Sequence, residues 1–332
     1  MYDKIKIKLY DLPDGYSWRN VLNSERVKDV LYRKDGTGGF GKWHDKKIVA
    51  TENYVSFVGS LPKCLYGHNL KTLNLEQVRR LIMNLSRDLG VPMYKAIVES
   101  VEFAHNFEMK EPPYLYFRNL RGLQGYSNNN WEETIYFENS NFRCKFYDKI
   151  KEAKNKRELP LYGKEDLPRN FLRYELTVNN KGIKKLFGRD ICVEELWDKY
   201  VFWKLVAEWF GHYEDIDKVA DEYWSIDFRV FRTLKDFIDW GICILNRDQN
   251  MSYYIKTLFK HRDNPKPEDR VLHKKLQDKI KEAQKWGVYN LPASSLIIEL
   301  TEKIEKYLAW LLEQSDDRMT IEEENKLFGV AC

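Results

Sequence analysis

Three residues in separate segments of the chain carry the side chains needed for metal-assisted cleavage of a phosphodiester bond. Glu102 and Glu175 each lie in a segment rich in β-forming residues, and Tyr147 follows the basic residues Arg143 and Lys145. Carboxylates are ligands that Mg²⁺ and Mn²⁺ favour, and such ions polarise phosphoryl oxygens. A tyrosine hydroxyl has an ordinary pKa of about 10, so it is a weak nucleophile at neutral pH unless cations or a metal-bound phosphate assist it.

Side-chain alternation along a strand assigns these groups to faces. Between residues 142 and 147, Tyr147 shares a face with Arg143 and Lys145, and Lys149 follows if the strand continues. The apolar side chains of this segment point the other way. Tyr147 is therefore expected on a cationic face.

The two glutamates occupy comparable positions. Glu175 shares a face with Arg173, opposite the apolar side chains of residues 171–178, and Glu102 lies on the face opposite His105. Spacing alone does not show that the three strands are neighbours, so ordinary solvent-facing strand residues explain the pattern better at this point.

The composition indicates a globular protein of about two domains. The chain has 332 residues, of which 43% are hydrophobic and 14% aromatic. No apolar run reaches the roughly 20 residues that span a bilayer, and the charged, alternating N-terminus does not resemble a signal peptide, so we expect a cytoplasmic protein without membrane contact. Zinc ribbons and disulfide frameworks are disfavoured because the cysteines are odd in number and widely spaced. They are Cys64, Cys144, Cys192, Cys243 and Cys332.

Positive charge is concentrated in one segment. Residues 142–190 contain 14 Lys and Arg against 7 Asp and Glu, whereas the net charge of the whole chain is only +4. A local basic block suits a phosphate backbone, although a solvated charged surface explains the charge alone better.

Periodicity predicts two regions. The first half reads as strands at residues 3–10, 53–58, 96–104, 134–137, 142–147 and 171–178, with a helix at 75–89 that has a capping box at Asn74 and Gln77. From about residue 194 the spacing becomes helical, over residues 194–211, 228–246, 251–262, 268–286 and 294–314. We therefore predict an α+β fold: an antiparallel-sheet nicking domain at 1–190 and a mostly helical domain at 191–332 for DNA or partner binding.

Six short motifs, in the same order along the chain, resemble the gene II/X replication initiators of filamentous phages and related phage and plasmid replication proteins. They cover roughly residues 1–240. The motifs are the opening Met-x-Asp, Gly67-His68-Asn69, Ser100-Val101-Glu102 with Asn106-Phe107, Asn130-Trp131-Glu132, Tyr147-Asp148-Lys149-Ile150-Lys151-Glu152 and Leu172-Arg173-Tyr174-Glu175. The acidic strand usually carries Asp where this chain has Glu102, which makes the ligand role of this residue less secure.

The resemblance implies a rolling-circle replication initiator. Tyr147 would nick single-stranded origin DNA, forming a 5′-phosphotyrosine link and a free 3′-OH primer, with Lys149 assisting. Glu102 and Glu175 would bind Mg²⁺ or Mn²⁺. The family is distantly similar to HUH-type initiators and relaxases, but this chain lacks the His-hydrophobe-His triplet.

Each of the further candidate site residues also has an ordinary structural explanation. Arg143, Lys145, Lys151 and Arg173 are expected to contact DNA, although Arg173 also suits a pair with Glu175. The remaining candidates could assist at the metal or the phosphate, as His68 could by binding either, Glu152 by supporting a metal ligand and His105 as a ligand if its strand has a bulge. They also have simpler roles as a turn-capping histidine, its neighbour, a surface carboxylate and a histidine on the opposite strand face. They are His68, Asn69, Glu152 and His105.

Two other functions remain open. A conjugative or mobilisation relaxase would use the same chemistry, and a non-enzymatic nucleic-acid-binding protein would stack Tyr147 on a base. As an initiator, the chain would act on single-stranded and origin DNA in the bacterial host, with host helicase and polymerase as partners. The sequence does not define its oligomeric state.

Overall fold

The chain forms two compact units. The computed structural model describes residues 1–131, 133–158, 170–218, 230–249, 251–260, 266–290 and 294–313. The first unit contains Met1–Tyr114 and Gly125–Glu214 together with the last turn of helix α11 (Ser295–Glu313), and the second contains Leu115–Gln124 and Asp215–Leu308.

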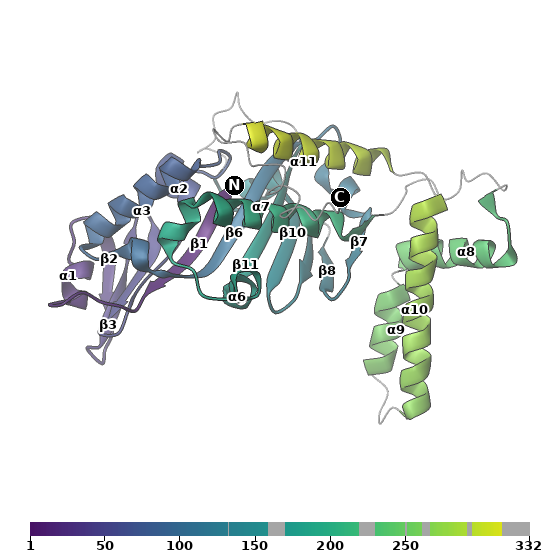
Figure 1. Cartoon of the computed structure of the whole chain (residues 1–332), viewed down its shortest axis with the longest axis horizontal. Coiled ribbons are helices and arrows are strands. Elements are labelled where there is room, and N and C mark those ends of the chain that lie inside the picture. Colours follow the sequence, from purple (N-terminus) through teal and green to yellow (C-terminus); the bar gives the residue numbers. More distant parts are fainter. Residues whose placement is uncertain are drawn as a thin grey trace. The chain divides into compact units, whose positions relative to one another are not determined.

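A sheet of ten strands forms the centre of the first unit (Figure 1). All neighbouring strands are antiparallel, in the order β2-β3-β4-β5-β1-β6-β11-β10-β9-β8. In chain order the strands are β1 (Tyr2–Leu9), β2 (Val27–Tyr32), β3 (Gly38–Trp43), β4 (Lys46–Thr51), β5 (Val55–Ser60), β6 (Ile97–Glu108), β8 (Ser127–Trp131), β9 (Thr134–Glu138), β10 (Phe142–Asp148) and β11 (Phe171–Asn179).

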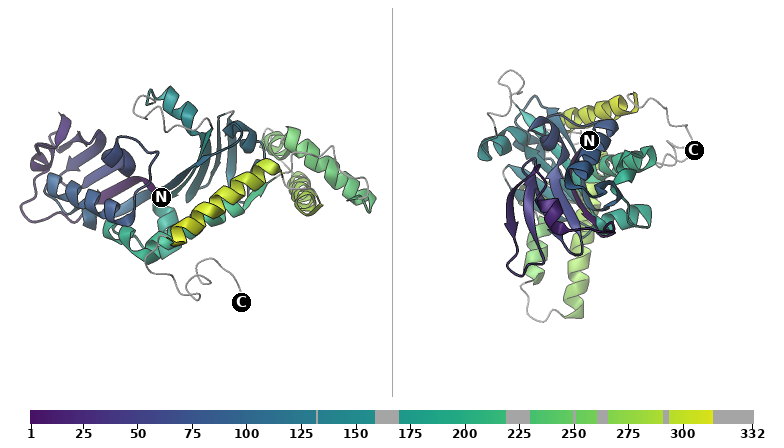
Figure 2. Two further views of the ribbon diagram at one scale, coloured as in Figure 1. Left: turned by 90° about the horizontal axis from the view of Figure 1, so that it is seen from above. Right: turned by 90° about the vertical axis from the view of Figure 1, so that its left-hand side faces the viewer.

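Helices connect these strands. They are α1 (Trp18–Leu22), α2 (Leu61–Tyr66), α3 (Leu75–Leu89), η1 (Met93–Lys95), α5 (Lys149–Asn155), α6 (Asn180–Phe187), η3 (Val193–Trp197) and α7 (Lys199–Glu214). In the left view of Figure 2, α3 and α7 lie on one side of the sheet and α5 lies on the other.

The sheet therefore has a covered face and an open face. Tyr174 of β11 points to the covered face, where its hydroxyl donates a hydrogen bond of 2.8 Å to the Trp209 carbonyl of α7 and the two rings stack with centroids 4.8 Å apart. Ile5, Phe103 and Leu176 are also fully buried, and strand register puts them on this face. The next residue along each strand points to the open face, because side chains alternate.

The first unit ends later than the sequence predicted. The expected boundary at residue 190 would separate α7 from the sheet, but α7 packs on it, and the unit extends to Glu214. The reason is hydrophobic burial: Trp203, Leu205 and Trp209 of α7 are inaccessible to water, and an apolar helix of this kind must be covered by a core.

The second unit is mainly helical, as predicted for the C-terminal region. It contains the two-stranded sheet β7 (Leu120–Leu123) and β12 (Ile216–Lys218), and the helices α8 (Leu234–Gln249), α9 (Met251–Lys260), α10 (Pro267–Asn290) and most of α11. Helix α4 (Pro113–Phe117) lies at the junction of the units in sequence. Cys243 and Ala283 form a small core with Trp240 and Trp286. Among the described helices, none has the length and apolar character needed to cross a bilayer.

The strongly periodic elements agree with the prediction, and local capping explains two differences. Helix α3 has the expected capping box and ends at Gly90 in the left-handed conformation. Asn179 does not open a loop but caps α6 by accepting a hydrogen bond from the Gly182 amide. Asp148 likewise caps α5, so Lys149 begins a helix and does not extend strand β10.

Candidate active site

Tyr147 lies in a buried hydrogen-bonded position on the open face of the sheet. Strands β10 and β11 pair so that Tyr147 faces Arg173 and Lys145 faces Glu175. The Tyr147 hydroxyl donates a hydrogen bond of 2.7 Å to Oε1 of Glu175. Burial and the Glu175 carboxylate raise the pKa of Tyr147 well above its usual value of 10.0. The tyrosine is therefore a neutral hydrogen-bond donor in this arrangement.

Three carboxylates come together beside this tyrosine. Asp3, Glu102 and Glu175 each place an oxygen within 4.8 Å of the others. The sequence predicted Glu102 and Glu175 as a ligand pair, and the structure brings both to the open face through the pairing of β6 with β11. Asp3 completes a set of hard oxygen donors of the kind that Mg²⁺ and Mn²⁺ bind.

Asp3 reaches the open face because strand β1 is irregular. Strict alternation would place Asp3 with the buried side chains of Ile5 and Ile7, and the sequence analysis did not select it as a ligand. The pairing of β1 with β6 shifts register between Tyr2 and Ile5, which breaks the alternation. The Met-x-Asp motif was the one sequence signal that pointed to Asp3.

Arg173 joins the carboxylates into one network. Its Nε donates to Oε1 of Glu175 at 2.6 Å, and its Nη2 pairs with Asp3. Its Nη1 donates to Oδ1 of Asn106 at 2.9 Å and to the Asn69 carbonyl at 3.0 Å. The guanidinium is only 2% exposed, so the expected contact with DNA phosphate is not what this geometry favours. The alternative, a pair with Glu175, is observed.

Two amide side chains extend the network. Asn69 donates through Nδ2 to Asp3 at 2.9 Å, and Asn106 donates to the carbonyls of Asn69 and Leu70. The turn that delivers Asn69 follows Gly67, which ends α2 with a left-handed φ of 77°, a conformation that favours glycine. Asn106 was part of the motif match but was not predicted as a site residue.

The carboxyl groups of the cluster differ in how readily they lose their protons. Despite burial, the Arg173 guanidinium and hydrogen bonds from Ser60 and Asn69 lower the pKa of Asp3. Burial and then the Glu175 and Asp3 carboxylates raise the pKa of Glu102 well above its usual value of 4.5. With all three carboxyl groups ionised, Arg173 would offset one of the three negative charges, and a divalent cation would balance the other two. Both hydrogen bonds described to Glu175 reach Oε1, which leaves Oε2 for such an ion.

Lys149, which is buried, forms an ion pair with the partly buried Glu152 next to the tyrosine. They lie one turn apart on α5, with Nζ of Lys149 2.6 Å from Oε2 of Glu152. The Lys149 side chain is 1% exposed and its Nζ lies 5.8 Å from the centre of the Tyr147 ring. Burial lowers the pKa of Lys149, with a further contribution from Arg173. Glu152 is thus not the ordinary surface charge considered in the sequence analysis: despite burial, Lys149 and Lys156 hold its pKa at about 2.

The other basic candidates are more exposed. Nζ of Lys145 lies 3.9 Å from the centre of the Tyr147 ring, so it is close to the nucleophile candidate. Arg143 pairs with Glu138 at 2.8 Å at a side-chain exposure of 55%. Lys151 is also exposed and lies 3.3 Å from Glu133. Their DNA-binding roles remain predictions.

Neither histidine candidate takes part in the carboxylate cluster. Nδ1 of His68 accepts a hydrogen bond of 3.3 Å from the Leu70 amide, which is the turn-capping role considered in the sequence analysis. His105 pairs with Tyr174 across β6 and β11 and packs against Phe107, so it lies on the covered face. Of the Asn-Trp-Glu motif, Glu132 lies outside the described residues.

A match to a protein-family model agrees with the resemblance in the sequence motifs. Residues 39–203 match the family model for the N-terminal region of the phage replication-associated protein encoded by gene II. A solved rolling circle replication initiator protein from Geobacillus stearothermophilus is similar to the chain at 12% identity and a TM-score of 0.37, over 64% of this chain and 84% of that chain. No curated protein matches the chain significantly. The family match spans both Tyr147 and Glu175, and the chain belongs to the phage and plasmid family of rolling-circle replication initiators.

Proposed function

We propose that the chain is the nicking enzyme of a rolling-circle replicon, which cuts one strand of origin DNA through Tyr147. The observation that carries this proposal is the 2.7 Å hydrogen bond from the Tyr147 hydroxyl to Glu175, a member of the three-carboxylate cluster. A nucleophile and its proton acceptor within hydrogen-bonding distance are the arrangement that covalent catalysis requires.

The proposed reaction is a transesterification. The Tyr147 oxygen attacks the scissile phosphorus, and the hydroxyl proton moves to Oε1 of Glu175. The bond from phosphorus to the 3′ oxygen breaks, the 5′ phosphate stays on Tyr147, and the 3′ oxygen takes up a proton to become the primer hydroxyl. Lys145, 3.9 Å from the ring centre, is positioned to favour the negative charge that develops on the tyrosine oxygen.

Asp3, Glu102 and Glu175 would hold one Mg²⁺ or Mn²⁺ ion. When bound, the ion would polarise a phosphoryl oxygen of the substrate. Arg173 acts as a positioning residue, because its bonds to Asp3 and Glu175 fix two of the three carboxylates.

The test compares Tyr147→Phe with the wild-type protein. Both are incubated with single-stranded DNA of the parent replicon and Mn²⁺ or Mg²⁺, and covalent protein–DNA bands are resolved on a denaturing gel. We expect the wild-type band to disappear in Tyr147→Phe, because phenylalanine keeps the ring's packing and removes the oxygen. DNA binding should remain.

Tyr136→Phe is the matched control, since Tyr136 lies on neighbouring strand β9 opposite Lys145. An undiminished covalent band in Tyr147→Phe, or its loss in Tyr136→Phe, would assign the chemistry to another tyrosine. Wild-type DNA binding without any covalent band or nick would favour the non-enzymatic alternative.

We further propose that the first unit carries the nicking chemistry and the helical second unit contributes origin or partner contacts. All the site residues described above lie between Asp3 and Glu175, within the first unit. A fragment that tests this division would end at Glu214, because α7 belongs to the core of the sheet.

A further inference from the structure

A row of lysines crosses the open face of the sheet from its far edge toward the candidate active site. Strand register aligns directly opposite residues, which share a face. Across successive strands from β2 to β11 the aligned residues are Lys28, Lys42, Lys47, Val58, Lys6, Ser100 and Asn179. We call Lys28, Lys42, Lys47 and Lys6 the lysine row. At a strand spacing of about 4.8 Å, the row extends over roughly 19 Å.

The lysine row is unfavourable for the fold by itself. Lys28, Lys42 and Lys47 stand on three adjacent strands, and like charges directly opposite one another destabilise a sheet. Two pairs offset part of the charge: Lys42 with Asp29 and Lys6 with Glu99, each at 2.8 Å. Both lysine side chains are about half exposed in these pairs, at 51% and 52%. A bound polyanion would remove the repulsion.

A second row of aligned side chains runs beside the first. Leu31, Phe40 and Val49 pair across β2, β3 and β4, two or three residues along each strand from the lysines. We call these three residues the apolar row. Leu31 is 59% exposed and Phe40 is 40% exposed, so both present apolar surface to solvent on the open face. Beyond Val49, the same alignment passes through Ser56 of β5 to Lys8 of β1. The Nζ of Lys8 lies 3.7 Å from the centre of the Tyr54 ring.

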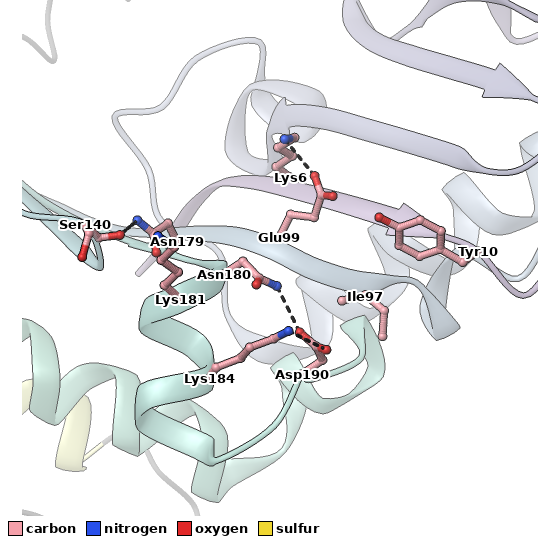
Figure 3. A pocket seen from close by; sticks show the side chains of 10 residues that line it. All are labelled: Lys6, Tyr10, Ile97, Glu99, Ser140, Asn179, Asn180, Lys181, Lys184 and Asp190. Atoms are coloured by element: carbon pink, nitrogen blue, oxygen red, sulfur yellow. Dashed lines mark hydrogen bonds and ion pairs between the residues drawn. The ribbon is translucent and has the colours of Figure 1, made fainter.

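Lys6, the last lysine of the row, lines a pocket together with residues of β6, β11 and α6 (Figure 3). This pocket has a volume of about 630 Å³, and Lys6, Asn179, Lys181 and Lys184 are among the residues that line it. The rest of its lining includes Glu99 and Asp190, which pair with Lys6 and Lys184. The pocket is therefore polar and carries a small excess of positive charge.

The row and the candidate active site share strands and a face. Ser100 and Asn179 are paired on β6 and β11, and the next pair on the same face is Glu102 with Thr177. Two residues along a strand correspond to roughly 7 Å. A chain molecule that follows the lysine row therefore arrives beside the carboxylates.

We propose that the open face of β2, β3, β4, β5 and β1 is a track for single-stranded DNA, with the lysine row on phosphates and the apolar row against bases. The inference rests on the proposed function for the identity of the ligand. Cations that follow a backbone, beside flat apolar and aromatic side chains that accept bases, are the combination by which proteins hold single strands. A duplex hides the faces of its bases in stacking, so it cannot use the apolar row.

The test measures binding of a fluorescein-labelled 30-nucleotide single strand of mixed sequence by fluorescence anisotropy. The full chain carrying Tyr147→Phe is used with EDTA, so that neither nicking nor metal affects the result. We expect the triple variant K28Q/K42Q/K47Q to bind about tenfold more weakly at roughly 0.1 M salt, with a salt dependence reduced by about two ion equivalents. Phe40→Ala should bind roughly fivefold more weakly with an unchanged salt dependence.

The control variant R79Q/K95Q/K199Q removes three exposed cations from α3, η1 and α7, and we expect its affinity to stay within twofold of the parent. Thermal unfolding checks that the variants are folded. The melting temperature of K28Q/K42Q/K47Q should be no lower than that of the parent, because the substitutions remove repulsion between neighbouring lysines. Unchanged binding in this variant, or an equal loss in the control, refutes the track. The preference of the track for single strands is refuted if the parent binds a 30-base-pair duplex as tightly as the single strand and K28Q/K42Q/K47Q weakens both equally.

The two proposals fail in different ways. If K28Q/K42Q/K47Q with Tyr147 intact nicks a long replicon strand as well as the wild-type protein and binds it equally well, the track is wrong and the nickase proposal stands. If the wild-type protein never nicks but the lysine variant loses single-strand binding, the track stands and the nickase proposal is wrong.

Discussion

Replacing Glu102 with glutamine should distinguish its proposed role in metal binding from its contribution to the stability of the fold. Burial and the neighbouring Glu175 and Asp3 carboxylates raise the pKa of Glu102 well above 4.5, so without metal this side chain is biased toward its neutral form. Glutamine reproduces that neutral form in nearly the same volume. We therefore expect Glu102→Gln to leave the metal-free melting temperature unchanged or slightly higher near neutral pH.

The pH dependence of stability gives the sign of this effect. A carboxyl whose pKa is raised in the folded state contributes stability that is fully present below its unfolded pKa, near 4.5, and is lost as pH rises through the folded pKa. The metal-free wild-type protein should thus lose stability over this range through Glu102. Glu102→Gln lacks a titrating group there, so its decline should be smaller.

A divalent ion should reverse the comparison. An ion at one hundred times its dissociation constant stabilises the folded state by about 2.7 kcal/mol. For a unit of 150–250 residues, this corresponds to a rise of roughly 5–11 °C in melting temperature. We expect this rise in the wild-type protein with Mn²⁺ or Mg²⁺, growing with pH as the ion displaces the Glu102 proton. In Glu102→Gln most of the rise should be absent.

The assay is thermal unfolding of the full chain at several pH values, with EDTA or with increasing Mn²⁺ or Mg²⁺. Glu99→Gln is the matched control, since Glu99 lies on the same strand, pairs with Lys6 and is outside the carboxylate cluster. The control should keep the full metal-dependent rise. The reasoning is refuted if Glu102→Gln keeps the wild-type rise, or if it is strongly destabilised in EDTA.

Two further variants examine the groups around the cluster. Arg173→Gln should lower the free energy of unfolding by roughly 3–5 kcal/mol in chemical denaturation, because it leaves the buried Asp3 and Glu175 carboxylates without their guanidinium partner; a loss below about 1 kcal/mol would contradict this role. Glu152→Gln should remove roughly 1–2 kcal/mol of stability at neutral pH after screening by solvent. Lys149 and Lys156 hold the pKa of Glu152 at about 2. The wild-type protein should therefore have the higher free energy of unfolding above pH 4.5, and this difference should vanish as pH falls through about 2. A difference that does not change with pH would exclude this cause.

The sequence predicted the elements whose patterns are local and strong. The hairpin of residues 134–147 and the helix capped by Asn74 agree with the structure. The helical character after residue 194 also agrees, but the helix expected at 194–211 is divided into η3 and α7, and α8 begins at Leu234 instead of residue 228. Strands β2, β3 and β4 were not predicted, because residues 27–51 mix glycines and lysines with few apolar positions. Their register can be explained only by the pairing of whole strands, which a local pattern does not contain.

The candidate site shows the same limit. Alternation correctly put Tyr147 on one face with Arg143 and Lys145, and Glu175 with Arg173, but the adjacency of the strands came from the fold. Asp3 could not be assigned to the open face by period, because the register shift in β1 occurs at this residue.

The position of Lys149 illustrates how a cap can override a pattern. Extrapolation of strand β10 places Lys149 two residues beyond Tyr147 on the same face. Instead, Asp148 accepts hydrogen bonds from the amides of Ile150 and Lys151 and starts a helix. The helical spacing then pairs Lys149 with Glu152, so these parts of the Tyr-x-Lys-x-x-Glu motif meet through one helical turn.

The arrangement around Tyr147 also indicates what must change before it can attack. The Tyr147 hydroxyl donates a hydrogen bond to Glu175, and burial together with this carboxylate raises the pKa of Tyr147. The same bond fixes the direction of the oxygen, which lowers the entropy that the reaction must overcome. In the proposed mechanism, the raised pKa of Tyr147, and not the position of its oxygen, must therefore change before the attack. A cation held by the three carboxylates would offset the negative charge of Glu175 and favour the tyrosinate, so the cation would activate a hydroxyl whose direction is already fixed.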